Sequence, residues 1–182
     1  MKIYINTILF INALIMLVSF PVQKLSGSEK SLNKSDKTFS KGMLNPEAPP
    51  ETEQFGQLAG IWDAEHVKRN RDGSWSDKKT KTEWHWYYIL DGHAIQDDWI
   101  SVEKHEESSS ILIPVGTNIR IYNPEEAKWY MAWIDKNNRR LASFTATYKD
   151  DEIIMSGQNA QGRQIRNTFF NISRNNFDWK QE

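Results

Sequence analysis

Few residues of this chain have the type and spacing that acid–base chemistry needs. Asp97 and Asp98 are adjacent, and adjacent strand residues point to opposite faces, so the two carboxylates cannot act together as a general acid and base. Asp97 shares a face with Ile95 and Trp99. If that face is buried, the carboxylate needs a cationic partner, and the pair would either anchor a ligand's polar group or be structural. The candidate cations are Arg120, Arg139, Arg163 and Arg166.

The histidines lack the spacing of metal ligands, so we predict no metal site. They are His66, His85, His93 and His105. Haem is the one cofactor that the sequence leaves as an alternative, because a small apolar barrel can hold it through a single axial histidine, here His85 or His93. The chain has no cysteine, glycine-rich phosphate loop, serine nucleophile elbow or HExxH motif, and therefore shows no established catalytic signature. If the protein is an enzyme, we expect Asp97 or His93 to act as the general base.

Eight tryptophans, all after residue 60, are the most informative feature of the composition. Trp84, Trp86 and Tyr88 alternate along the sequence, so in a strand they share one face. That face either lines an apolar cavity or packs as a filled core, because each aromatic side chain buries ~150–250 Å². The predicted cavity residues are Trp84, Trp86, Tyr88, Asp97, Trp99, Arg120, Trp129 and Trp133. We assign no catalytic residues.

Turn residues that recur at strand-length spacing separate the segments that carry these side chains. Asp72-Gly73 and Asp91-Gly92 are typical of tight hairpins, because both residue types tolerate a positive φ. The strands expected between such turns span residues 60–69, 79–89, 93–102, 111–122, 128–134, 141–148, 152–156, 164–172 and 177–182. Pro114 or Gly116 is expected to interrupt the fourth of them.

Tight turns make neighbouring strands antiparallel, and a run of such neighbours must close or leave its edges exposed. We therefore predict an all-β, antiparallel up-and-down barrel of about eight or nine strands, which can hold one small ligand. A β-sandwich is the alternative fold. It needs a longer crossover connection, and the only candidate for one is the polar segment 104–110.

The N-terminal third of the chain differs from the rest in composition. Lys2 precedes an almost wholly apolar run over residues 3–20, which predicts a signal peptide at 1–21 and an exported, periplasmic or secreted protein. An uncleaved membrane anchor is the alternative, and it would be the only contact with a membrane. Residues 22–54 read as a flexible linker and 55–182 as the barrel domain. The balance of 23 basic and 24 acidic residues gives no indication of nucleic acid as a partner.

Several segments of the barrel domain together resemble a known family. They are residues 55–63, 89–97 through Trp99, 116–117 with 120–124, and 177–179, with Trp129 and Trp133 before the last of these. The likeness is to uncharacterised bacterial exported, lipocalin-like proteins, the domain of unknown function 1579 group, and its most specific part is the Leu90-Asp91-Gly92 block. It implies a calycin-type β-barrel but brings no established activity. Gly60-x-Trp62 also resembles the start of lipocalins proper, which implies that Trp62 is a structural plug of the barrel floor.

The chain departs from the family pattern in two places. His93 stands where the family usually has arginine, and family members continue past Phe177-Asp178-Trp179 into a further hairpin and a final strand. We therefore expect a barrel that is open because this C-terminal strand is missing.

Three functions are compatible with this sequence. The leading one is an exported binding module for a small, mostly apolar ligand. The alternatives are an enzyme that acts on an apolar substrate in the same cavity, and a structural envelope protein with a filled core. The interior volume separates them, because a cavity of several hundred Å³ favours the first two and a filled interior favours the third. Oligomeric state and ligand identity are not determined by the sequence.

Overall fold

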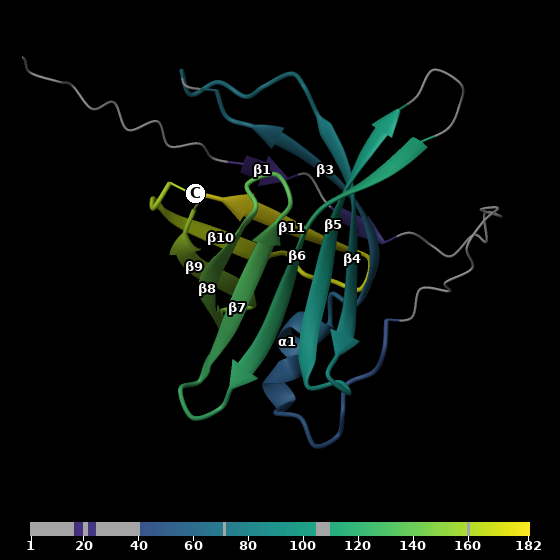
Figure 1. Ribbon diagram of the computed structural model, residues 1–182, viewed down its shortest axis with the longest axis vertical. Coiled ribbons are helices and arrows are strands. Elements are labelled where there is room, and N and C mark those ends of the chain that lie inside the picture. Colours follow the sequence, from purple (N-terminus) through teal and green to yellow (C-terminus); the bar gives the residue numbers. More distant parts are fainter. Residues whose placement is uncertain (1–16, 20–21, 25–40, 71, 105–109, 160) are drawn as a thin grey trace, which may run out of the picture.

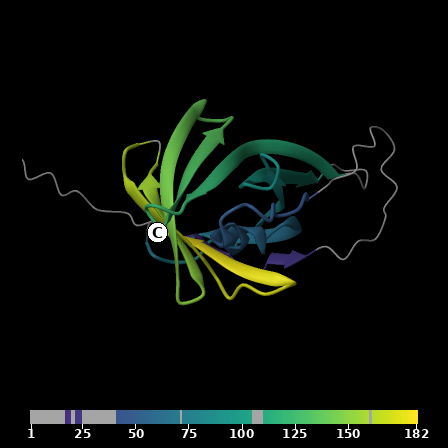
Figure 2. The same ribbon diagram turned by 90° about the horizontal axis from the view of Figure 1, so that it is seen from below.

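The computed structural model describes residues 17–19, 22–24, 41–70, 72–104, 110–159 and 161–182. Within them the chain forms an antiparallel sheet that curls into an open half-barrel (Figures 1 and 2). Its nine main strands are β3 (Gly60–Lys68), β4 (Thr80–Ile89), β5 (Ala94–Lys104), β6 (Ser110–Asn123), β7 (Lys128–Asp135), β8 (Arg140–Lys149), β9 (Glu152–Gln158), β10 (Gln164–Phe170) and β11 (Asn176–Gln181).

Each of these strands pairs with the next one along the chain, in the up-and-down order that tight turns dictate. The all-β fold expected from the sequence is thereby confirmed, and no crossover of the kind a sandwich needs joins β3 to β11 within the described residues. Alternation places Trp84 and Trp86 of β4 inside the curve and His85 toward the outside. Side chains that alternate inward fill one end of the half-barrel and line a cavity at the other.

The expected interruption of the fourth long segment is a β-bulge. Trp99 pairs with Gly116 whereas Ile100 pairs with Pro114, so Val115 is the extra residue on β6. A Cβ atom at Gly116 would collide with the ring of Trp133 and with the carbonyl of Ile134, so the ring approaches this backbone only because the residue is glycine. The bulge thus helps to seat Trp133 inside the curve.

A short helical segment covers one end of the half-barrel (Figure 1). The 3₁₀ turn η1 (Pro50–Thr52) leads into α1 (Glu53–Gly56), and the side chains of Phe55 and Leu58 are fully buried. Trp62 is also fully buried, packs against Phe177 and donates from its indole to the Leu58 carbonyl at 2.6 Å. Four helical residues are too few to produce a helical period, which is why the sequence gives no indication of α1.

The segment 41–54, which the sequence places in the flexible linker, lies against this closed end. The amide of Tyr88 donates to the carbonyl of Lys41, and Asn45 bonds to the backbone of both Asp91 and Gly92. Gly92 has a φ of +82° and touches Met43 and Asn45 so closely that a Cβ atom would not fit. The structure therefore differs from the sequence expectation over 41–54, because backbone hydrogen bonds and a glycine contact hold a segment that is poor in apolar residues. Most of the expected linker, 25–40, lies outside the described residues.

The odd number of main strands determines the relative direction of the two edge strands, β3 and β11. Nine successive antiparallel strands leave β3 and β11 running in the same direction, and no pairing joins them directly in the described part of the chain. The short strands β1 (Leu17–Ser19) and β2 (Val22–Lys24) are each antiparallel to both edge strands.

Residues 1–16 and 20–21 of the expected signal segment lie outside the described residues. No helix among the described residues has the length and apolar character to cross a membrane.

The strap of residues 41–50 makes a testable contribution to stability. A chain that begins at residue 51 loses the hydrogen bonds of Lys41 and Asn45 and the burial of Ala48. We expect it to melt about 5 °C or more below a chain that begins at residue 41, as measured by circular dichroism. Equal melting temperatures would show that the strap does not stabilise the barrel.

Candidate ligand-binding cavity

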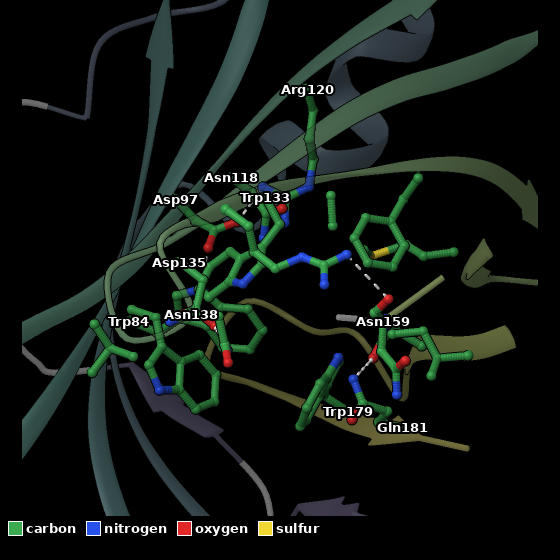
Figure 3. A pocket seen from close by; sticks show the side chains of 18 of the residues that line it. Trp84, Asp97, Asn118, Arg120, Trp133, Asp135, Asn138, Asn159, Trp179 and Gln181 are labelled. Atoms are coloured by element: carbon green, nitrogen blue, oxygen red, sulfur yellow. Dashed lines mark hydrogen bonds and ion pairs between the residues drawn. The ribbon is translucent and has the colours of Figure 1, made fainter. Parts of the chain in front are cut away.

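A fully buried ion pair lies at the centre of the half-barrel. Asp97 of β5 and Arg120 of β6 both have no exposed surface, and a guanidinium nitrogen of Arg120 contacts Asp97 Oδ1. The indole of Trp84 donates to the other carboxylate oxygen at 2.7 Å, and the side chain of Asn118, which is directly opposite Asp97 in the β5–β6 register, also bonds to it. Figure 3 shows Arg120 descending toward Asp97 and Asn118.

Burial and hydrogen bonding act in opposite directions on the pKa of Asp97. Burial raises the pKa of the carboxyl group, while Arg120, Trp84 and Asn118 each lower it. Burial likewise lowers the pKa of Arg120, against the attraction of Asp97. All three neighbours of the carboxylate are donors, so a protonated Asp97 would have no acceptor among them for its own hydrogen. We therefore treat the pair as ionised and mutually neutralised.

The ion pair separates two different halves of the interior. On the side of α1, the Arg120 guanidinium carbon lies 4.8 Å from the ring centre of Phe55 and 4.4 Å from that of Trp86, at distances typical of cation–π contacts. Trp129 packs edge-on against Phe55 at 4.9 Å and donates to the side chain of Gln54. This half is a filled aromatic core.

On the other side of the ion pair lies a cavity of about 350 Å³ (Figure 3). Most of its wall is aromatic or aliphatic, and four of the eight tryptophans take part. The apolar lining is Trp84, Trp99, Val115, Trp133, Ala142, Phe144, Met155, Ile165, Phe169 and Trp179. Its volume lies within the ~300–1,000 Å³ range of small-molecule pockets.

Polar side chains line the remainder of the cavity. From the turns after β7 and β9 and from neighbouring strands come Asp135, Asn138, Arg140, Asn159, Gln161, Asn167 and Gln181. Burial raises the pKa of Asp135, but hydrogen bonds from Asn138 and Asn137 outweigh this effect and leave the pKa below its ordinary value. Asp135 and Arg140 face one another in the β7–β8 register. The cavity therefore holds two acidic and two basic side chains, and their formal charges cancel.

The structure places the eight predicted cavity residues in two groups. Those that line the cavity are Trp84, Asp97, Trp99, Arg120 and Trp133. The others belong to the closed end: Trp86 and Trp129 are fully buried in the core, and Tyr88 donates to Glu53 at 3.0 Å. Among the four cations considered for Asp97, Arg120 alone is buried, since Arg139, Arg163 and Arg166 are exposed.

None of the described histidines lines the cavity. His85 is on the outer face and contacts Glu83 at 3.0 Å, His93 lies in the β4–β5 turn, and His66 is buried beside the ring of Trp99, where burial lowers its pKa. His105 falls outside the described residues. The two histidines considered for haem are thus not positioned to hold it inside the cavity, and no cluster of three potential metal ligands occurs in the described part of the chain.

Sequence reasoning missed several residues of the cavity. Asn118 is the most informative of them, because it is two residues from Arg120 in an extended segment and so shares its inward face. The same alternation relates Trp179 to Gln181 and Asn167 to Phe169. Alternation identifies these inward faces, but it does not give the register that brings β6, β10 and β11 around one space.

Comparison with known proteins adds no relative. The chain matches no protein-family model, no curated protein and no solved structure.

The ion pair predicts a strong dependence of stability on both of its partners. Asp97→Asn and Arg120→Met should each lower the free energy of unfolding by about 3–5 kcal/mol, because each leaves an uncompensated buried charge. In urea unfolding, the loss in free energy of unfolding of the double variant should be about 2 kcal/mol smaller than the sum of the losses of the two single variants. Arg166→Met, which breaks the exposed pair with Glu182, is the matched control and should cost less than about 1 kcal/mol. Additive losses would contradict a direct coupling.

The same pair predicts a pH effect in one variant. In Arg120→Met the cation that opposes burial is gone, so the pKa of Asp97 rises further above that of the unfolded chain. The folded variant then binds a proton that the unfolded chain releases, and its stability falls as pH rises through that interval. We expect the difference in free energy of unfolding between the wild type and Arg120→Met to be smaller at pH ~5 than at pH ~7. A deficit that grows on acidification would contradict this assignment.

Proposed function

We propose that this protein is an exported binding module that takes a small, mostly apolar ligand into the cavity beside the Asp97–Arg120 pair. The observation that carries the proposal is the cavity itself: its volume is about 350 Å³, four tryptophans contribute to its wall, and the neutralised Asp97–Arg120 pair lies beside it. Export rests on the apolar N-terminal run of the sequence, and we also propose kinship with the lipocalin-like domain of unknown function 1579 group on the residues given above.

The division of the interior favours binding over a purely structural role. A structural barrel gains stability from every apolar side chain that fills its interior. Here the filled core stops at Arg120, and beyond it the rings of Trp99, Trp133 and Trp179 remain partly exposed inside the curve of the sheet. Apolar surface left open in a concave site is the usual basis of small-molecule binding.

The enzyme alternative has less support from the residues considered for it. Asp97 is fully buried and its oxygens already accept from Arg120 and Trp84, so they are not free to remove a substrate proton. His93 lies in the β4–β5 turn and is absent from the cavity lining.

Direct detection of a bound molecule tests the proposal first. The protein purified from its own host's envelope should retain a small mass in native mass spectrometry, and an accompanying absorbance spectrum would reveal haem by a Soret band. The stripped protein should bind the uncharged fluorescent probe N-phenyl-1-naphthylamine.

Two matched variants locate the binding site of that probe. Ala142→Trp places a large side chain in the cavity and should weaken probe binding at least tenfold, whereas Ala132→Trp on the outer face of β7 should leave the affinity unchanged. A bare protein mass together with no probe binding by the wild type would overturn the proposal in favour of a structural protein.

A further inference from the structure

We propose that the cavity selects an uncharged, planar aromatic ligand that carries an N–H or O–H group, and that the side-chain oxygen of Asn118 accepts the hydrogen bond from that group. This inference rests on the proposed function, since it names the ligand class of the same cavity. Three features carry it: the balance of charge, the aromatic walls and one unpartnered acceptor.

The charge balance excludes an ionic ligand as the preferred one. Asp97 and Arg120 neutralise each other in a buried ion pair, and Asp135 and Arg140, which carry opposite charges, are register partners in the β7–β8 pairing. A carboxylate or ammonium group brought beside the buried pair would find no uncompensated charge of opposite sign to offset its lost hydration. A neutral molecule carries no such cost.

The walls favour a flat ring system. Trp84 and Trp99 meet edge to face, with ring centres 4.7 Å apart and an interplanar angle of 71°. Trp179 stands 5.9 Å from Trp99, and Trp133 approaches the β6 backbone at Gly116. Aromatic faces and edges at these spacings offer stacked and T-shaped contacts, which a planar aromatic ligand uses better than an aliphatic chain of equal volume.

Asn118 supplies the polar determinant. Its side chain lines the cavity but is only 8% exposed, and hydrogen bonding from its amide helps to lower the pKa of Asp97. Its Oδ1 atom has no hydrogen-bond partner among the described residues. A buried acceptor without a partner is costly, and a ligand donor would relieve that cost.

Arg120 does not compete for this role, although its remaining nitrogens also lack oxygen partners. Its guanidinium lies over the rings of Phe55 and Trp86, neither of which lines the cavity. Arg120 also lines the cavity, but its guanidinium is engaged by Asp97 and by these two rings, whereas the side-chain oxygen of Asn118 has no partner among the described residues.

Four naphthalene probes test the inference by calorimetric titration of the stripped protein. They are 2-naphthol, 2-methoxynaphthalene, naphthalene and 2-naphthoate. We expect 2-naphthol to bind at least tenfold more tightly than 2-methoxynaphthalene, which lacks the donor, and more tightly than the anionic 2-naphthoate. In Asn118→Leu the preference for 2-naphthol should disappear, while the affinity for naphthalene is kept or increased.

Asn167→Leu is the matched control. Asn167 is also buried and lines the same cavity, but its Oδ1 already accepts from Gln181 at 3.0 Å. This variant should keep the preference for 2-naphthol even if its melting temperature falls, which separates recognition from folding.

The outcomes distinguish the two proposals. Equal binding of the three uncharged probes would overturn the role of Asn118 and leave the binding function standing. Tightest binding of 2-naphthoate would overturn the charge argument. No binding of any probe by the wild type would overturn the proposed function and the inference together.

Discussion

The buried ion pair between Asp97 and Arg120 determines what each half of the barrel interior can contain. A charge removed from water is tolerated only where its partner and its remaining hydrogen-bonding groups are fixed in place. Trp84 and Asn118 form hydrogen bonds with the Asp97 carboxylate, and the rings of Phe55 and Trp86 lie against the Arg120 guanidinium. These four side chains are consequently constrained in position, and the packing on either side follows from them.

On the α1 side the constraint produces a sealed core. The Arg120 cation holds two aromatic rings, and Phe55 reaches that position only because η1 and α1 bring it into the end of the half-barrel. Trp62 and Trp129 then tie the helical segment to β3 and β7 through their indole N–H groups. The indole N–H groups of these two tryptophans are thus satisfied by the segment that closes the barrel, and the strap 41–50 is held over the same end.

Much of this architecture could be predicted from the sequence, and the reasons for success and failure are physical. Strand positions followed from turn residues and alternation, because both are local. The need of a buried Asp97 for a cation followed from the face that it shares with Ile95 and Trp99, but four arginines were candidates, and alternation alone does not select Arg120 among them. The division of the aromatic residues did not follow. Trp84 and Trp86 have the same local pattern, yet one lines the cavity and the other fills the core, because the difference depends on which end α1 covers. Such a contact between distant segments leaves no periodic trace in the sequence.

The cavity side is where the chain departs from the packing that stability alone would favour. Replacing a buried ion pair by apolar side chains is often neutral or stabilising, and filling a void of this size with apolar atoms would stabilise further. This chain instead combines a charged pair, an acceptor without a partner at Asn118 and tryptophan rings left partly uncovered. Local departures from optimal packing that gather in one concave place are typical of functional sites, whose stability cost is offset elsewhere in the fold. Here the filled aromatic core around Arg120 supplies the stabilisation that offsets this cost. The same ion pair therefore marks the end of the core and allows an open, neutral cavity beside it.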